Sequence, residues 1–274
     1  MKRPLLFTLF FICTPVLLAA RVLQQIYMID TVTGFYKDDF GYVGNIITIV
    51  CLLLIPVLLL TVWLSRPTAV VPNVRSKALG IASFFATICL AISGVTQIIT
   101  ATHSGYFALA IMSFATAAVI VLHGIACFTD GKFNGWLTIV CVIYGLTRLV
   151  ITFMGYTGEV TVTDTLFDIA TMALLLLFFY SSGKIIAGVA GPRTPVLFYA
   201  YGLSAAFFCV DSFLAPAIVK FMGDGFAIHS GGHFDLSYLG FAVYIIVMIY
   251  VYSGDKAKVK VTDDNTQSNK TGLK

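Results

Sequence analysis

Eight apolar segments, separated by short polar stretches, run along almost the whole chain and constrain its fold more than any other feature. Hydrophobic residues make up 59% of the sequence and charged residues 11%. With so few polar groups the chain cannot cover a water-exposed surface, so we expect lipid to cover most of it. A helix needs about 20 mostly apolar residues to cross the hydrocarbon core. The expected spans are 5–20, 42–64, 78–100, 106–128, 136–154, 165–180, 196–219 and 236–252.

This pattern predicts an all-α, polytopic integral membrane protein with eight transmembrane helices in four hairpins, formed by residues 1–252. The remaining segment, 253–274, contains five Lys, three Asp and no aromatic residue. That composition is typical of a chain that stays disordered in water, so we expect a basic tail and no soluble domain. The six cysteines all fall within apolar spans, which argues against a disulfide framework.

The basic residues predict the orientation of the spans. If the N-terminus is cytoplasmic, 13 of the 17 Lys and Arg residues lie in cytoplasmic segments and three in outer loops, as the positive-inside rule requires. We therefore expect a plasma-membrane protein with both termini in the cytoplasm. The first span also resembles a signal peptide, although Leu18 occupies a cleavage position that favours a small residue. Its removal would leave seven spans with an outer N-terminus.

Two sequence echoes suggest internal duplication. Asp39-x-x-Tyr42-x-Gly44 and Asp235-x-x-Tyr238-x-Gly240 each follow a long outer loop, and an Asp at this position is expected to cap an inbound helix. Basic residues nine apart follow both the second and the sixth spans. The second echo suggests two parallel four-helix repeats, an architecture known in transporters. Convergence is the alternative, because all inbound helices favour similar caps.

The common enzyme motifs are missing from the sequence. It has no Walker-type phosphate loop, no His-Glu-x-x-His and no Gly-x-Ser-x-Gly. We therefore expect neither ATP-driven transport within this chain nor a common hydrolase, and we predict no cofactor and no nucleic-acid partner. His229 and His233 are four residues apart in an outer loop, but Ser230-Gly231-Gly232 between them argues against a helical metal site, so no metal is expected.

Ionisable residues inside the spans are the main candidates for function, because each costs about 3 kcal/mol or more in the membrane unless it is paired. Arg148, Asp168 and Asp211 are all expected in the outer half of the bilayer. Arg148 is predicted to pair with Asp211, with Asp168 or with both. The alternatives are an ion pair that only holds helices together and, for Asp168, a helix cap formed with Thr165.

Neighbouring polar residues extend this group. Tyr144 lies four residues before Arg148 and therefore on the same helix face. Gln97 belongs to a polar stripe on the third span, together with Ser93 and Thr100. These residues are expected to line an outward-facing polar cavity, although Gln97 is equally suited to a hydrogen bond between helices. The candidate ligand-binding residues are thus Arg148, Asp211, Gln97, Tyr144 and Asp168, and no catalytic residue is proposed.

Three functions remain open at this point. The leading hypothesis is binding or translocation of a small solute or ion, with Arg148 holding an anionic group and Asp211 taking a proton or cation. The second is a non-catalytic membrane subunit, sensor or scaffold, whose basic tail is attracted to anionic lipid and whose protein partners are unknown. The third is an intramembrane lipid-modifying enzyme that uses Asp211 with His123 or an outer histidine. Apart from these, the expected partner is the lipid bilayer.

Overall fold

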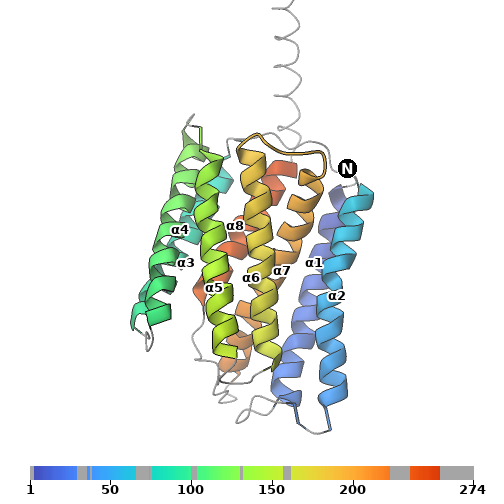
Figure 1. The fold of residues 1–274 in the computed structure, drawn as a ribbon. Helices are drawn as coiled ribbons and strands as arrows, with labels where there is room; N and C mark the ends of the chain where they lie inside the picture. Colours follow the sequence, from blue (N-terminus) through green and yellow to red (C-terminus); the bar gives the residue numbers. More distant parts are fainter. Residues whose placement is uncertain are drawn as a thin grey trace, which may run out of the picture.

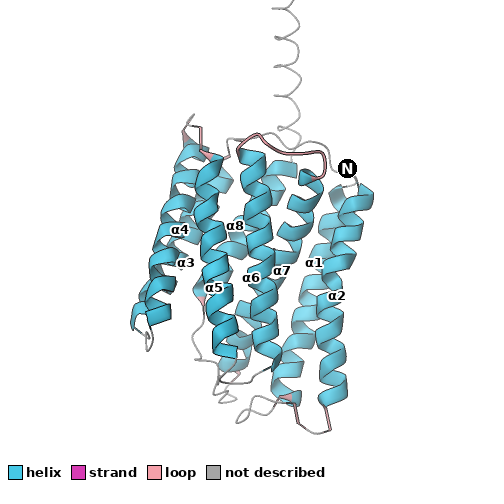
Figure 2. Ribbon diagram, viewed as in Figure 1, coloured by secondary structure: helices cyan, strands magenta, loops and turns pink. Residues whose placement is uncertain are grey.

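Eight long helices make up most of the computed structural model, which describes residues 3–29, 36–37, 39–65, 74, 76–99, 104–129, 132–156, 162–222 and 235–253. All eight are long and apolar enough to cross a membrane, which confirms an all-α polytopic membrane protein. They are α1 (Arg3–Leu23), α2 (Gly41–Ser65), α3 (Lys77–Ile99), α4 (Ser104–Phe128), α5 (Thr138–Tyr156), α6 (Val162–Ile186), α7 (Thr194–Phe221) and α8 (Leu236–Ser253). Figures 1 and 2 show them side by side as an antiparallel bundle.

Several helices extend beyond the expected spans. The segment after Ala20, predicted as the start of an outer loop, stays helical to Leu23 and continues as a π-helix, η1 (Gln24–Met28). Its polar residues are buried against other helices rather than exposed in a loop, and hydropathy alone cannot detect such burial. Helix α6 likewise continues past Tyr180 to Ile186, with the Ser181 hydroxyl donating to carbonyl groups of the preceding turn. Such bonds satisfy hydroxyls within the helix itself.

Six of the described helices form a closed ring. Helices α3, α4, α5, α6, α7 and α8 each pack against the next in this order, and α8 packs back against α3. Helices that face each other across the ring, such as α5 and α8, meet through side chains. The ring interior is therefore where side chains from helices distant in sequence come together.

The α1–α2 hairpin lies outside this ring and packs against α7. The two halves of the chain, α1–α4 and α5–α8, therefore occupy unequal places: α5 and α6 are ring members, whereas α1 and α2 are not. The packing does not have the two-fold relation that a pair of four-helix repeats would produce. Duplication of a hairpin remains a hypothesis about ancestry.

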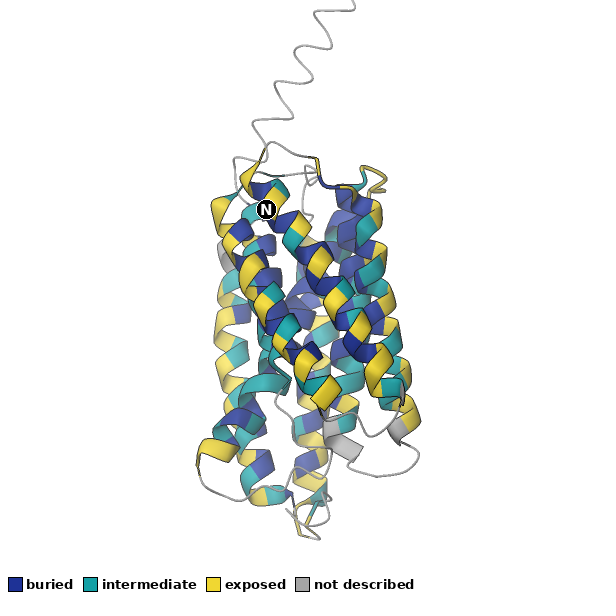
Figure 3. Ribbon diagram, turned by 90° about the vertical axis from the view of Figure 1, so that its left-hand side faces the viewer, coloured by how far each residue is buried: buried dark blue, intermediate teal, exposed yellow. Residues whose placement is uncertain are grey.

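Burial follows this arrangement. Exposed residues run along the outward helix faces and buried residues along the inward ones (Figure 3), and the exposed ones are largely apolar. Such a surface suits lipid rather than water. Helix α7 packs against both its ring neighbours and the hairpin, and 67% of the residues in its membrane-spanning part are buried, compared with 22% in α5. All six cysteines are free thiols.

The chain reverses direction at each loop, so the beginning of α1 and the end of α8 lie at the same end of the bundle, at the top of Figure 1. We call this the N-terminal end and the other the opposite end. The predicted basic tail, beyond residue 253, lies outside the described residues.

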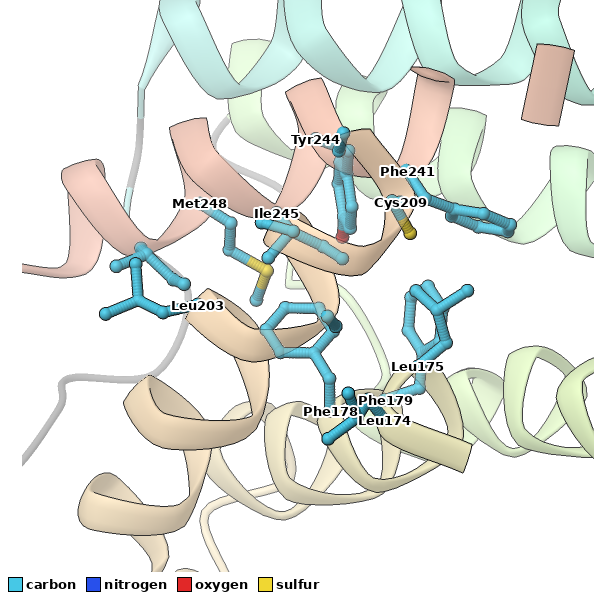
Figure 4. Packing of buried hydrophobic residues seen from close by; sticks show 14 of the residues in the cluster. Leu174, Leu175, Phe178, Phe179, Leu203, Cys209, Phe241, Tyr244, Ile245 and Met248 are labelled. Carbon is cyan, nitrogen blue, oxygen red and sulfur yellow. The ribbon is translucent and has the colours of Figure 1, made fainter. Parts of the chain in front are cut away.

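Small residues let neighbouring helices approach closely. A Cβ atom at Gly240 on α8 would lie 2.8 Å from the Cβ of Cys89 and 3.1 Å from the Cα of Ala86, both on α3. The Gly240 position therefore fits only a glycine without local adjustment. Farther along the ring interior, aromatic and aliphatic side chains from α6, α7 and α8 face one another (Figure 4), among them Phe179, Phe241 and Tyr244.

Candidate functional site

The ring interior near the opposite end contains a buried ion pair between Arg148 on α5 and Asp235, the residue directly before α8. Nη1 of Arg148 contacts Oδ2 of Asp235, and their side chains are only 11% and 13% exposed. A buried charge is tolerated when it is paired and hydrogen-bonded. The prediction that Arg148 pairs with Asp211 or Asp168 is wrong, because its partner in this ion pair is Asp235.

The unequal lengths of two consecutive helices bring Asp235 into the bundle. Helix α7 has 28 residues and α8 only 18, a difference of about 15 Å at 1.5 Å per residue. Both have an end at the N-terminal end, so α8 begins well above the lower end of α7 in Figure 1. Asp235 also caps α8, because its Oδ1 accepts the Ser237 backbone N–H at 3.0 Å. The expected cap is confirmed, and its burial is the unexpected part.

The surroundings keep the Asp235 carboxyl group ionised. Burial by itself raises its pKa. The nearby Arg148 guanidinium and hydrogen bonds from Ser237 and Ser93 lower it more, so the pKa lies below its ordinary value. The Ser93 hydroxyl donates to Oδ1 at 2.7 Å. Asp235 is therefore an anion paired with Arg148, and it accepts hydrogen bonds from the Ser93 hydroxyl and from both the hydroxyl and the backbone N–H of Ser237.

The Arg148 side chain has three further contacts. Its Nη1 lies 3.2 Å from the Tyr144 hydroxyl and 3.2 Å from the Ser237 hydroxyl, both of which accept from it. The guanidinium carbon lies 4.6 Å from the ring centroid of Tyr238, the geometry of a cation–π contact. Tyr144, predicted from its spacing to be a neighbour of Arg148, is thus confirmed as a contact.

Tyr238 connects Arg148 to Asp168. The Tyr238 hydroxyl donates to Oδ1 of Asp168 at 2.8 Å, across from α8 to α6. The interpretation of Asp168 as the cap of its helix is wrong, because α6 begins at Val162 and Asp168 lies in its second turn. The Asp168 carboxylate instead faces the ring interior, where Tyr238 lies between it and the Arg148 guanidinium.

A chain of hydrogen bonds leads from Asp235 through α3 to α4. Gln97 on α3 donates from Nε2 to the Ser93 hydroxyl at 3.1 Å, and the Ser113 hydroxyl on α4 donates to Oε1 of Gln97 at 3.1 Å. Gln97 therefore bonds between helices, and it also belongs to the Arg148 network. We call Arg148, Asp235, Tyr144, Tyr238, Asp168, Ser237, Ser93, Gln97 and Ser113 the Arg148 network.

One side of the guanidinium is left open by this network. Within the described residues, the ion pair and both hydrogen bonds of Arg148 use Nη1. Arginine has five N–H donors arranged as a planar fork that matches a carboxylate or phosphate. Among the described residues, no ion pair or hydrogen bond involves Nη2 or Nε of Arg148.

Asp211, the remaining predicted site residue, lies in a second charged centre. Oδ2 of Asp211 on α7 is 3.9 Å from Nε of Arg21 on α1, and each side chain is 2% exposed. The guanidinium of Arg21 also lies 4.2 Å from the Phe167 ring centroid on α6. The prediction that Asp211 shares a site with Arg148 is wrong, because α7 turns this carboxylate toward the α1–α2 hairpin and away from the ring interior.

Polar residues of the π-helix surround this second centre. The Gln24 side-chain amide accepts from Arg21 and donates to the Gly44 carbonyl at 2.7 Å and the Thr48 hydroxyl at 3.0 Å. It also donates to the Tyr36 hydroxyl at 2.6 Å. These bonds join α1 to α2, and the Arg21–Asp211 pair joins both to α7. The centre therefore fastens the peripheral hairpin to the ring.

Sequence reasoning missed three important members of the Arg148 network. Asp235 was expected only to cap a helix, and neither Tyr238 nor Ser113 was among the predicted site residues. The Asp-x-x-Tyr-x-Gly echo did single out the first two, but the matching Asp39 and Tyr42 are exposed, so the pattern by itself does not identify a site. Thr100, His229 and His233 lie outside the described residues. Among those that are described, no three His, Cys, Asp or Glu side chains gather as metal ligands.

Comparisons of the chain with protein-family models, with curated proteins and with solved structures yield no match.

Proposed function

We propose that this protein binds, and carries across the membrane, a small solute or ion with an anionic group, and that the Arg148 network is its binding site. The observation that carries the proposal is the Arg148 guanidinium, buried inside the helix ring with Nη2 and Nε unoccupied by described polar groups. Ionisable residues inside a membrane commonly mark substrate or ion pathways. A carboxylate or phosphate would complete the fork of donors.

Each residue of the Arg148 network that contacts the solute has its own role in the proposed binding. Asp235 is the resident counter-ion, so an incoming anion competes with it for the guanidinium. Tyr144, Gln97 and Asp168 bond to members of the network and would hold polar groups of the solute. Asp211 is not part of this site, because it pairs with Arg21.

The membrane and the orientation belong to the same proposal. We place the protein in the plasma membrane, and the counts of basic residues favour an orientation with the N-terminal end of the bundle in the cytoplasm. The Arg148 network would then be closer to the external face. Exposed Val189 between α6 and α7 and exposed Met222 after α7 lie at opposite ends of the bundle, so they offer positions for testing this orientation.

Ligand-induced stabilisation tests the binding site. Purified protein is heated in detergent with L-glutamate, succinate, citrate or inorganic phosphate, and a rise in the unfolding temperature identifies an anion that binds. Arg148→Gln should abolish that rise. Arg21→Gln is the matched control, since it also removes a buried guanidinium but should preserve the response. An equal response in wild type and Arg148→Gln would overturn the proposal.

Proteoliposome uptake of the identified anion tests translocation. Wild-type protein should carry the radiolabelled anion into vesicles, and Arg148→Gln should reduce its initial rate to that of protein-free vesicles. Binding without any uptake would favour a receptor or sensor. This outcome would move the conclusion to the second candidate function.

A non-catalytic membrane subunit or sensor is that second candidate. Its support is an apolar groove on the hairpin, lined by residues of α1 and α2 that include Cys13, Leu17, Leu54 and Val57. The hairpin stands outside the ring, where a partner helix could reach it. Recovery of a stable complex after affinity capture in mild detergent would support this function, and recovery of the chain alone would count against it.

The lipid-modifying enzyme is the weakest of the three hypotheses. Asp211 bonds within the Arg21 centre, whereas His123 bonds to Tyr244 on the other side of α7, inside the ring. The two proposed catalytic groups therefore belong to separate networks. An acid–base pair must share one reacting group.

A further inference from the structure

A second polar cluster occupies the ring interior nearer the N-terminal end. His123 on α4 is 3% exposed, and its Nδ1 lies 2.8 Å from the Tyr244 hydroxyl on α8. Helices α4 and α8 are not ring neighbours, so the hydrogen bond crosses the interior. The other ring nitrogen, Nε2, lies 3.9 Å from the Cys127 sulfur, a weak partner for an imidazole.

An aromatic layer separates this cluster from the Arg148 network. The Phe241 ring on α8 packs at 5.9 Å from Tyr144 and 5.5 Å from Phe179 on α6, and Phe179 stacks at 6.5 Å on Tyr244. Tyr244 follows Tyr238 by six residues, about 9 Å along the helix axis. The ring interior therefore contains two polar clusters, and an apolar layer that includes Phe179 and Phe241, both labelled in Figure 4, lies between them.

We infer that His123 and Tyr244 form a proton-binding site, and that this protein couples proton movement to the passage of its anionic solute. The inference depends on the proposed function and adds the coupling ion to it. In transporters that work by alternating access, the substrate and coupling-ion sites lie near the middle of the membrane and open to one side at a time, and the two polar clusters of this protein share one ring interior. Histidine takes up and releases a single proton and serves in proteins as a proton shuttle.

The chemistry needs only one proton. The neutral imidazole accepts a proton from water at the N-terminal end and becomes an imidazolium, and release of that proton restores the neutral ring. The Tyr244 hydroxyl suits both forms, since it can donate to a bare Nδ1 or accept from a protonated one. No bond between heavier atoms changes.

The groups around the pair leave His123 as the only ready proton carrier among them. Cys127 on α4, Cys141 on α5 and Tyr252 on α8 are the titratable groups that act on Tyr244, and thiols and phenols are neutral at pH 7. From α6 comes the Phe179 ring, which does not titrate. A proton on His123 therefore changes the charge of the whole cluster.

A pH-sensitive dye trapped in proteoliposomes tests the inference. Vesicles of phosphatidylcholine and phosphatidylglycerol are filled with pyranine, and L-glutamate, succinate or inorganic phosphate is added outside. With wild-type protein, an anion that stabilises the protein should also change the internal pH, beyond the change in protein-free vesicles. His123→Gln should slow the initial pH change at least tenfold, and Tyr244→Phe should slow it less.

Controls separate this inference from the proposed function. Tyr252→Phe, another buried tyrosine of α8, should keep the wild-type rate. His123→Gln should keep the anion-induced rise in unfolding temperature, which also shows that it is folded. If His123→Gln does not fold, the rate of Tyr244→Phe decides, because that variant removes only a hydroxyl. A stabilising anion that moves no protons overturns the coupling alone, whereas an anion panel without any stabilising member removes the proposed site as well.

Discussion

Arg148 and Asp235 form an ion pair inside the helix ring although they come from opposite sides of it, α5 and the start of α8. The pair is possible because α8 is short enough for its capping residue to lie within the bundle. A single carboxylate therefore caps the beginning of α8, neutralises an intramembrane guanidinium and accepts a hydrogen bond from Ser93 of α3.

Removing the charge of Asp235 should destabilise the protein strongly. Asp235→Asn leaves the buried Arg148 without its counter-ion, and breaking such a pair costs about 3–5 kcal/mol. Thermal unfolding in detergent measures the loss. The matched control is Asp39→Asn, since Asp39 occupies the same place in the echoed motif before α2 but is exposed. Equal unfolding temperatures for the two variants would contradict the buried pair.

A second substitution should recover part of that stability. In the double variant Arg148→Gln, Asp235→Asn, no unpaired charge remains in the membrane, so the free energy of unfolding should exceed that of Asp235→Asn alone. A double-mutant cycle measures the interaction free energy between the two positions. Additive effects of the two single substitutions would show that the side chains do not interact.

The Tyr238 hydroxyl should stabilise the protein through its hydrogen bond to Asp168, separately from the cation–π contact between the Tyr238 ring and Arg148. Tyr238→Phe keeps the cation–π contact but removes the donor to Asp168, leaving a half-buried carboxylate with one bond fewer. The expected loss is about 1–3 kcal/mol, measured by thermal unfolding. Tyr42→Phe provides the comparison, because Tyr42 is 81% exposed and its hydroxyl should contribute little. A loss at Tyr42 as large as that at Tyr238 would argue against the Asp168 contact.

The close approach of α3 and α8 should depend on Gly240. Gly240→Ala places a methyl group against Cys89 and the α3 backbone at Ala86, and overpacking of this kind costs about 1–3 kcal/mol. Gly145→Ala is the control, since its nearest neighbour there, Leu176, would be 3.5 Å away. That variant should be neutral or slightly more stable, because alanine favours helices. Denaturation curves measure the free energy of unfolding of each variant, which should fall for Gly240→Ala and stay the same or rise for Gly145→Ala.

Thiol labelling should identify one accessible native cysteine and, with added cysteines, the orientation. Cys13 is partly exposed and the other five are buried, so a maleimide should label Cys13 fastest in detergent. In a Cys13→Ser background, Val189→Cys should react with an impermeant reagent only from the cytoplasmic side, and Met222→Cys only from outside. The reverse result would invert the predicted orientation.

The sequence predicted the helical spans well but their ends less well. Long apolar runs can be recognised from local hydropathy, and all eight were found. The continuation of α1 into η1 was missed because Arg21, Gln24 and Gln25 look like loop residues. They are helical because Asp211, Gly44 and Thr48 supply partners from other segments, and no local pattern carries that information.

The candidate site was predicted in part for the same reason. Arg148, Tyr144, Gln97 and Asp168 do belong to one network, since intramembrane polar residues must find partners. Depth along the bilayer was estimated correctly enough to bring them together. Depth does not give the rotation of a helix about its axis, however, and the rotation of α7 directs Asp211 toward Arg21.

The amino-acid sequence by itself determined that this is an eight-span membrane protein with a few costly charges inside it. It did so because the transfer of a segment into lipid depends on that segment's own composition. Only the tertiary structure decided which cation meets which anion. Pairing depends on the order of helices around the ring, on the face that each turns inward and on the depth at which α8 begins, and these are set by the packing of the whole bundle.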